Sequence, residues 1–213
     1  ARLEALLRVP LLALPEHGLG WPGSPSDPSR RTCRCDGSCQ RLLDVQVEVF
    51  TEALVQERAH PERGVVVRVG VGGGKTLISL LLPTLLSCSR PVLLVPAKLR
   101  EKTHRILPEV RRHWRVRSDI LVHTYEEVSV RPQMLDELGA DMVLCDESHR
   151  LARVSAGRTR RVLRFARSHP ECRWVLMSGT FDRRSPRDSS HLVEVSLRDG
   201  AYLPRHDGEL ESW

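Results

Sequence analysis

A glycine-rich turn that ends in lysine and threonine is the clearest chemical signal in the sequence. It reads Gly-Val-Gly-Gly-Gly-Lys-Thr, and it lies between an apolar run and an apolar segment of helical character. Backbone N–H groups of such a turn can surround phosphate oxygens, and the helix start adds partial positive charge. The lysine can reach the β and γ phosphates, and the threonine hydroxyl can bind Mg²⁺. The predicted phosphate-binding residues are therefore Gly72, Gly73, Gly74, Lys75 and Thr76.

One departure from the usual pattern limits this interpretation of the glycine-rich turn. The usual pattern begins with a glycine six positions before the lysine, where this chain has Val69. The alternative is a flexible glycine turn followed by a chance Lys-Thr pair. The strand-like run before the turn and the helix-like segment after it favour phosphate binding.

An acidic pair follows a later apolar run. Asp146 and Glu147 come directly after residues 141–145, and Ser148 and His149 follow them. An aspartate at a strand end can hold Mg²⁺, and the adjacent glutamate can orient and deprotonate an attacking water. The plain alternative is a helix start, where negative charge is favourable. The phosphate-binding turn upstream favours the catalytic interpretation.

Short apolar runs alternate with segments long enough for helices, a pattern typical of an α/β protein. Such alternation predicts parallel strands joined by helices, in a mostly parallel, doubly wound sheet with helices on both faces. Ligands of these sheets bind beyond the carboxyl ends of the strands. A further helix should begin near Leu42 and end before Pro61. The predicted strands are residues 65–69, 92–95, 120–123, 141–145 and 173–177, and the predicted helices 76–86, 98–112, 134–138 and 158–167.

The chain is predicted to have an N-terminal extension over residues 1–40 and a folded domain over residues 41–213. The extension is rich in proline, glycine and serine, which break regular structure. Its cysteines could bind a structural Zn²⁺ with a fourth ligand such as His17, although their spacing is not that of a paired knuckle. The alternative is a loop that happens to be cysteine-rich. These cysteines are Cys33, Cys35 and Cys39.

Composition describes an ordinary globular protein with a basic balance. Of 213 residues, 33 are Lys or Arg and 27 are Asp or Glu, which gives a net charge of +6. Nearly all the basic residues are arginine, which suits phosphate-bearing partners but would also result from a coding bias. We expect no membrane segment, because the apolar N-terminal stretch is short and interrupted. Low cysteine density favours a reducing setting such as the cytoplasm, or a host cell's cytoplasm for a phage protein.

Taken together, these motifs resemble motifs I, II and III of superfamily-two helicases and translocases of the DExH type. Gly-x-Gly-Lys-Thr corresponds to motif I, Asp-Glu-Ser-His to motif II and Ser178-Gly179-Thr180 to motif III. Lesser pieces agree: Gln46 resembles the glutamine that reads adenine, Pro96-Ala97 resembles motif Ia, and His123-Thr124-Tyr125-Glu126 resembles motif Ib. The match is especially similar to Swi/Snf-type translocases and helicase-like phage proteins. It implies a RecA-like P-loop NTPase domain.

The resemblance implies roles for individual residues. Hydrolysis of ATP with Mg²⁺ would use Lys75, Thr76, Asp146 and Glu147. Gln46 would bind the adenine base of the nucleotide. His149, Ser178 and Thr180 would couple the nucleotide state to nucleic acid, which Pro96, Lys98, Thr124 and Tyr125 would contact. Plain alternatives remain: Gln46 as a surface helix residue, Thr124 as a strand-end cap, and Ser178-Gly179-Thr180 as an ordinary turn.

Partners follow from the resemblance and from the basic stretches. Residues 98–117 and 150–167 are rich in basic side chains, which would track nucleic-acid phosphates, DNA more than RNA, or form solvated helix faces. Helicase motors also need a second RecA-like domain, and the 33 residues after Thr180 cannot form one. That domain is expected in a longer chain or in another chain. The alternatives are a nucleotide-gated binding module that does not move along DNA and the motor part of a restriction system.

Overall fold

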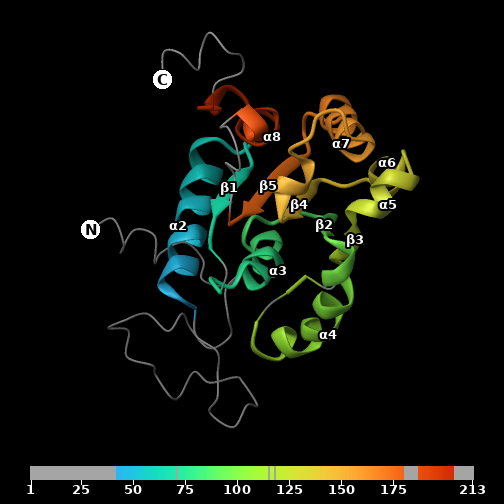
Figure 1. Ribbon diagram of the computed structural model, residues 1–213. Helices are drawn as coiled ribbons and strands as arrows, with labels where there is room; N and C mark the ends of the chain where they lie inside the picture. Colours follow the sequence, from blue (N-terminus) through green and yellow to red (C-terminus); the bar gives the residue numbers. More distant parts are fainter. Residues whose placement is uncertain (1–41, 71, 115, 118, 180–186, 204–213) are drawn as a thin grey trace, which may run out of the picture.

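A five-stranded, fully parallel sheet forms the centre of the protein (Figure 1). The computed structural model describes residues 42–70, 72–114, 116–117, 119–179 and 187–203. The strands lie in the order β1-β5-β4-β2-β3, and every neighbouring pair is parallel. This confirms the predicted α/β fold and its five strands. They are β1 (Val65–Arg68), β2 (Pro91–Val95), β3 (Leu121–Thr124), β4 (Met142–Asp146) and β5 (Arg173–Ser178).

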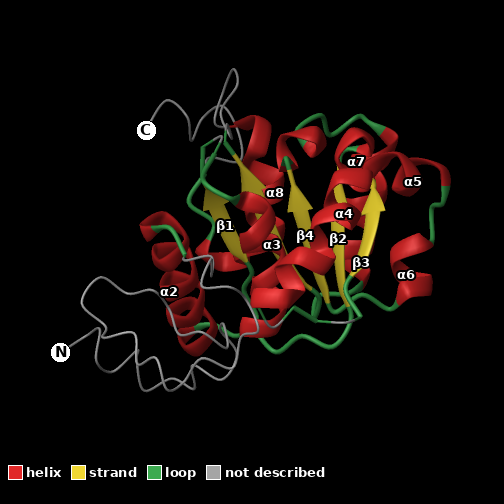
Figure 2. Cartoon of the chain, turned by 90° about the horizontal axis from the view of Figure 1, so that it is seen from below, coloured by secondary structure: helices red, strands yellow, loops and turns green. Residues whose placement is uncertain are grey.

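Helices cover both faces of this sheet, as a doubly wound fold requires (Figure 2). Alternate strand residues point to opposite sides: Leu93 and Val95 belong to one core, Val92 and Leu94 to the other. The first core contains residues of α2 (Asp44–Ala59), α3 (Lys75–Leu85) and α4 (Ala97–His113). The second contains residues of α5 (Tyr125–Val130), α6 (Met134–Leu138), α7 (Gly157–Ser168) and α8 (Arg187–Leu197).

Two of these helices were not predicted from the sequence. Helix α5 begins directly after β3, where the Thr124 hydroxyl accepts a hydrogen bond from the Glu127 amide at 3.1 Å. The Glu127 carboxylate in turn accepts from the Thr124 amide at 2.7 Å, which completes a capping box. Helix α8 follows β5 in sequence and contacts it and β1. Two short 3₁₀ helices complete the described elements, η3 (Ser148–Leu151) and η4 (Arg198–Gly200).

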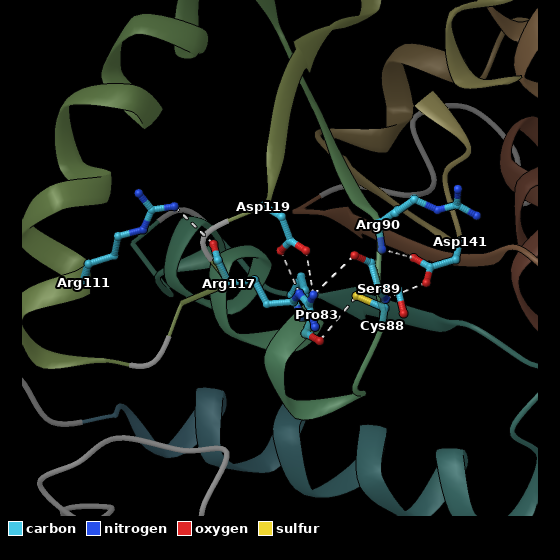
Figure 3. Close-up of polar contacts among 8 residues, drawn as sticks. All are labelled: Pro83, Cys88, Ser89, Arg90, Arg111, Arg117, Asp119 and Asp141. Carbon is cyan, nitrogen blue, oxygen red and sulfur yellow. Dashed lines mark hydrogen bonds and ion pairs between the residues drawn. The ribbon is translucent and has the colours of Figure 1, made fainter. Parts of the chain in front are cut away.

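Polar contacts hold the amino-terminal edge of the sheet (Figure 3). The Asp141 carboxylate accepts hydrogen bonds from the backbone amides of Ser89 and Arg90, at 2.5 and 2.8 Å. Arg117 donates to the Ser89 carbonyl at 3.3 Å and to both oxygens of Asp119. These contacts join the segments that lead into β2, β3 and β4. The predicted site residues lie at the opposite, carboxyl-terminal edge, in the turns that follow the strands.

Candidate functional site

The glycine-rich turn connects the end of β1 to the start of α3. Its backbone requires glycine at two positions, because Gly72 and Gly74 have φ angles of +87° and +70°. Gly74 is the N-cap residue of α3, so the turn leads straight into the helix start. Gly73 packs closely on the residue that replaces the usual first glycine: a Cβ atom on Gly73 would lie 2.2 Å from the side chain of Val69. The turn therefore has the strand, loop and helix context that phosphate binding needs.

Lys75 and the acidic pair meet at the carboxyl edge of the sheet. The Lys75 ammonium donates to the Val69 carbonyl at 3.1 Å and to the Gly70 carbonyl at 3.4 Å. It also lies 3.6 Å from Oε1 of Glu147. β5 separates β1 from β4 in the sheet, and its end therefore lies between the two motifs. The structure thus brings together the residues that the sequence predicts to share one triphosphate.

Asp146 is the last residue of β4, and its side chain is buried. Burial raises the pKa of its carboxyl group from 3.8 to about 6; Glu147 adds to this increase, and the positive charge of Lys75 opposes it. Oδ1 of Asp146 is buried without a hydrogen-bond partner among the described residues. An acidic oxygen that lacks a donor suits a divalent cation.

Glu147 occupies a backbone conformation that is rare for a residue with a side chain. Its φ and ψ angles are +54° and +51°, in the left-handed region, and its carbonyl accepts from the Arg150 amide as η3 begins. Its Oε2 lies 3.2 Å from Nδ1 of His149, which is also 3.2 Å from the Ser178 hydroxyl. His149 therefore links the acidic pair to the end of β5, where the third motif begins.

Gln46 contacts the glycine-rich turn. It is buried on α2, and its amide nitrogen donates to the carbonyls of Gly73 and Gly74, at 3.5 and 3.4 Å. Its amide oxygen accepts from the Leu43 backbone at 2.9 Å. The alternative interpretation, a surface residue of the helix, is therefore wrong.

The residues expected to contact nucleic acid have different surroundings. Lys98 is exposed on α4, and Pro96 is buried as the N-cap residue of that helix. Thr124 is buried and caps α5, the alternative role considered for it. Tyr125 is fully buried, and its hydroxyl donates to the Asp146 carbonyl at 2.7 Å. The expected contact of the Tyr125 side chain with nucleic acid is therefore wrong, because the aromatic ring faces the second core.

Two contacts of this region were not predicted from the sequence. Gly179 lies against the glycine-rich turn, since a Cβ atom on it would be 3.5 Å from the Val69 carbonyl and 3.7 Å from Lys75 Nζ. The Arg100 guanidinium pairs with Glu127 at 3.2 Å, which fixes the start of α5 to α4. The Ser178-Gly179-Thr180 motif gave a signal for Gly179, whereas the pair between α4 and α5 has none in the sequence.

Four predicted site residues lie outside the part of the chain that the structure describes: Thr180, Cys33, Cys35 and Cys39. Within the described ranges, no group of three or more His, Cys, Asp and Glu side chains could hold a metal ion. Likewise, none of the helices described there is long and apolar enough to cross a membrane. Zinc binding by the three cysteines stays a prediction.

Comparison with known proteins identifies a solved structure with a similar fold. No protein-family model matches the sequence, and no curated protein does. Among solved structures, the chain is similar to the SWI2/SNF2 ATPase core of Sulfolobus solfataricus in complex with dsDNA, with a TM-score of 0.58 and 15% sequence identity. The match covers 76% of this chain and 36% of that one. The likeness confirms the predicted RecA-like fold, and this chain corresponds to about a third of the length of that core.

Proposed function

We propose that this chain is the ATP-binding first motor domain of a nucleic-acid-dependent ATPase, a helicase or translocase of the DExH type. The observation that carries the proposal is the approach of the Lys75 ammonium to the Glu147 carboxylate, 3.6 Å apart, at the carboxyl edge of a RecA-like sheet. The buried Oδ1 of Asp146, which has no hydrogen-bond partner among the residues that the structure describes, belongs to the same edge. A phosphate-binding turn and an acidic pair at one edge are the parts that phosphoryl transfer requires.

The chain's own residues would hold the nucleotide. Amides of the glycine-rich turn and the start of α3 bind the phosphate oxygens, and Lys75 neutralises their charge. Gln46 reaches the same turn from α2, and we assign the binding of the adenine base to its amide. Binding would draw the Lys75 ammonium from the Val69 and Gly70 carbonyls toward the phosphates, because an anion is the stronger acceptor.

Magnesium fits the donors at this edge. Asp146 and Thr76 would hold it, with the remaining ligands from phosphates and water, since Mg²⁺ is usually bound through one or two carboxylates plus substrate phosphates. Bound there, the ion neutralises charge that develops on the transferred phosphoryl group. Glu147 would orient the attacking water and accept its proton. His149 and Ser178 would connect this reaction to the end of β5.

Nucleic acid and a second domain complete the proposal. Lys98, Lys102 and Arg105 are exposed along α4 at spacings of four and three residues, which places them on one helix face. Such a row can contact successive phosphates without reading the bases. The similar ATPase core was solved with dsDNA, so duplex DNA is the first partner to test. The second RecA-like domain, in the same chain or another, would supply the arginine finger. We assign the RecA-like domain to residues 41–213, with residues 1–40 as an extension.

ATP binding and hydrolysis by the chain test this proposal. We expect a fluorescent ATP analogue to bind the 213-residue chain in the presence of Mg²⁺. We expect the affinity of the Lys75→Ala variant for this analogue to be much lower. We expect hydrolysis by the chain alone to be slow, because loss of an arginine finger costs about 10³–10⁵ in rate in related enzymes. Hydrolysis is then measured with duplex DNA, with single-stranded DNA and without nucleic acid.

Each result of these assays has a definite meaning. Hydrolysis that duplex DNA stimulates, and that Lys75→Ala abolishes, supports a motor domain. Binding of ATP without stimulation by either form of DNA would favour the nucleotide-gated module. Equal analogue binding by the wild-type chain and Lys75→Ala would contradict the proposal at its centre.

A further inference from the structure

The hydroxyl of Tyr125 contacts the backbone of the acidic pair rather than solvent. Tyr125 is the first residue of α5 and is fully buried. Its hydroxyl donates to the Asp146 carbonyl at 2.7 Å, across 21 positions of the sequence. That carbonyl belongs to the peptide group that joins Asp146 to Glu147. The hydrogen bond therefore fixes the peptide plane from which the Glu147 side chain departs.

Glu147 needs such support because its backbone is strained. Left-handed backbone conformations of residues with side chains persist where surrounding contacts over-determine them, and they cluster at functional sites. Here the φ angle is +54°, and the carboxylate lies 3.6 Å from Lys75 and 3.2 Å from His149. A rotation of the preceding peptide group would carry the carboxylate away from both neighbours. The direction in which the Glu147 carboxylate points thus depends on the orientation of that peptide group.

Tyr125 is itself held firmly enough to serve as an anchor. It follows the N-cap residue Thr124, and the capping box between Thr124 and Glu127 fixes the first turn of α5. The Glu127 carboxylate also pairs with Arg100 of α4 at 3.2 Å. The Tyr125 ring packs in the second core, among buried side chains such as Cys145 and Leu151. Position and direction of the hydroxyl are therefore set by two helices and a packed core.

We infer that Tyr125 is a positioning residue, which holds the Asp146–Glu147 peptide in its left-handed turn so that Glu147 faces the reacting water. This inference rests on the proposed ATPase function and deepens it. Tyr125 is fully buried, and its hydroxyl is bonded to the Asp146 carbonyl, so we expect its loss to lower turnover and leave nucleotide affinity unchanged. A residue that only stabilised the fold would not produce this separation.

The test compares two variants that each lose one buried hydroxyl. Tyr125→Phe removes the hydrogen bond to Asp146. Ser196→Ala removes a comparable hydrogen bond near the amino-terminal end of β5, where the Ser196 hydroxyl donates to the Trp174 carbonyl at 2.8 Å. We expect Tyr125→Phe to lower kcat for ATP roughly 10- to 100-fold, as small misplacements of catalytic groups do. We expect Ser196→Ala to retain kcat, and both variants to bind the ATP analogue within about two-fold of the wild type, as unchanged ground-state contacts require. Thermal unfolding establishes that both are folded at the assay temperature.

A double variant and a crystal structure complete the test. If Tyr125 acts through Glu147, Tyr125→Phe adds no loss of rate in a Glu147→Gln background, because groups that act as a unit are not additive. A crystal structure of Tyr125→Phe should show Glu147 with a changed φ. Wild-type kcat in Tyr125→Phe, a full further loss in the double variant, or an unchanged Glu147 would each overturn the inference. Failure of the proposed function would instead be seen in the wild-type chain itself, which would then bind no ATP or show no stimulation of hydrolysis by DNA.

Discussion

The carboxylate of Glu147 contacts the imidazole of His149, with Oε2 of the one 3.2 Å from Nδ1 of the other. Its second oxygen faces Lys75. Each oxygen of the glutamate therefore has a neighbour that can carry positive charge, which holds the carboxylate in one orientation. A water that attacks a phosphate beside Lys75 would meet this carboxylate at the correct edge of the sheet. The arrangement leads to the first prediction.

Replacement of Glu147 by glutamine should separate binding of ATP from its hydrolysis. The amide has nearly the same shape but cannot accept the proton of the attacking water, and loss of a general base costs about 10²–10⁴ in rate. We expect the ATP analogue to bind within about two-fold of the wild-type affinity, because Lys75 and the glycine-rich turn are unchanged. Phosphate release is the measurement. The control Glu137→Gln alters an exposed glutamate that pairs with Arg131; an equal loss of rate there would contradict the role of Glu147.

Stability of the nucleotide-free chain should depend on pH through Asp146. Burial raises the pKa of this carboxyl group in the folded state to about 6, against 3.8 in the unfolded chain. Between these values the folded state binds more protons than the unfolded state, so the free energy of unfolding falls as pH rises through this window. The cost at pH 7 is at most about 3 kcal/mol, from roughly 1.4 kcal/mol per pKa unit.

The variant Asp146→Asn removes this dependence. We expect it to be more stable than the wild type at pH 7–8 and to lose the advantage below about pH 4, where both states of the wild type hold the proton. Urea unfolding with EDTA, from about pH 3 to pH 8, measures the difference. Asp136→Asn, on the surface of α6, should leave the pH profile unchanged. Parallel profiles for the wild type and Asp146→Asn would show that the buried carboxyl is not the cause.

Much of the fold and of the site could be predicted because both follow from local patterns. Buried parallel strands have continuous apolar runs in their sequences. All five strands were therefore predicted with bounds within a few residues of the observed ones. The glycine turn and the acidic pair each follow a strand, and parallel strands bring their carboxyl ends to one edge. That rule placed Lys75 near Glu147 without any knowledge of the strand order.

The missed parts depend on contacts that a linear pattern does not record. Helix α5 has six residues, too few for a helical period, although the capping pair Thr124 and Glu127 was a usable signal. Tyr125 was misassigned because its role was taken from the resemblance to motif Ib, and a short motif says where a residue lies, not which way its side chain points. Its hydroxyl meets the Asp146 carbonyl because α5 and β4 both contribute side chains to the second core, although β2 separates β3 from β4 in the sheet.

Gly74 should tolerate alanine much less well than Gly70. The φ angle of Gly74 is +70°, and a Cβ atom there would lie 2.0 Å from the Gln46 amide nitrogen. At Gly70 an added Cβ would meet nothing within 4 Å. We expect Gly74→Ala to lose about 1–2 kcal/mol of stability, the cost of a side chain in the left-handed region. Urea unfolding of the two variants measures the difference, and equal losses would contradict the strained geometry of the turn.

Gln46 should affect both stability and the choice of base. Gln46→Ala removes the hydrogen bond from Leu43 and the contacts with Gly73 and Gly74, so we expect a loss of about 1 kcal/mol. If the amide also binds adenine, the ratio of ATP to GTP affinity falls in the same variant. Competition of ATP and GTP against the fluorescent analogue gives that ratio. Gln56→Ala, on the same helix away from the turn, is the control, and an unchanged ratio in Gln46→Ala would leave Gln46 with a structural role alone.

The exposed face of α4 should supply part of the affinity for DNA. Lys98 and Lys102 lie one helical turn apart and are both exposed. Each phosphate contact contributes about 0.9 to the slope of log K against log salt, because bound counterions are released. We therefore expect the double variant Lys98→Ala, Lys102→Ala to bind duplex DNA more weakly, equally for all sequences, with the slope smaller by up to about 2. Fluorescence anisotropy at several salt concentrations measures it. Arg90→Ala removes an exposed charge at the opposite edge of the sheet and should leave the slope unchanged; equal effects of the two changes would mean that net charge, and not the face of α4, attracts the DNA.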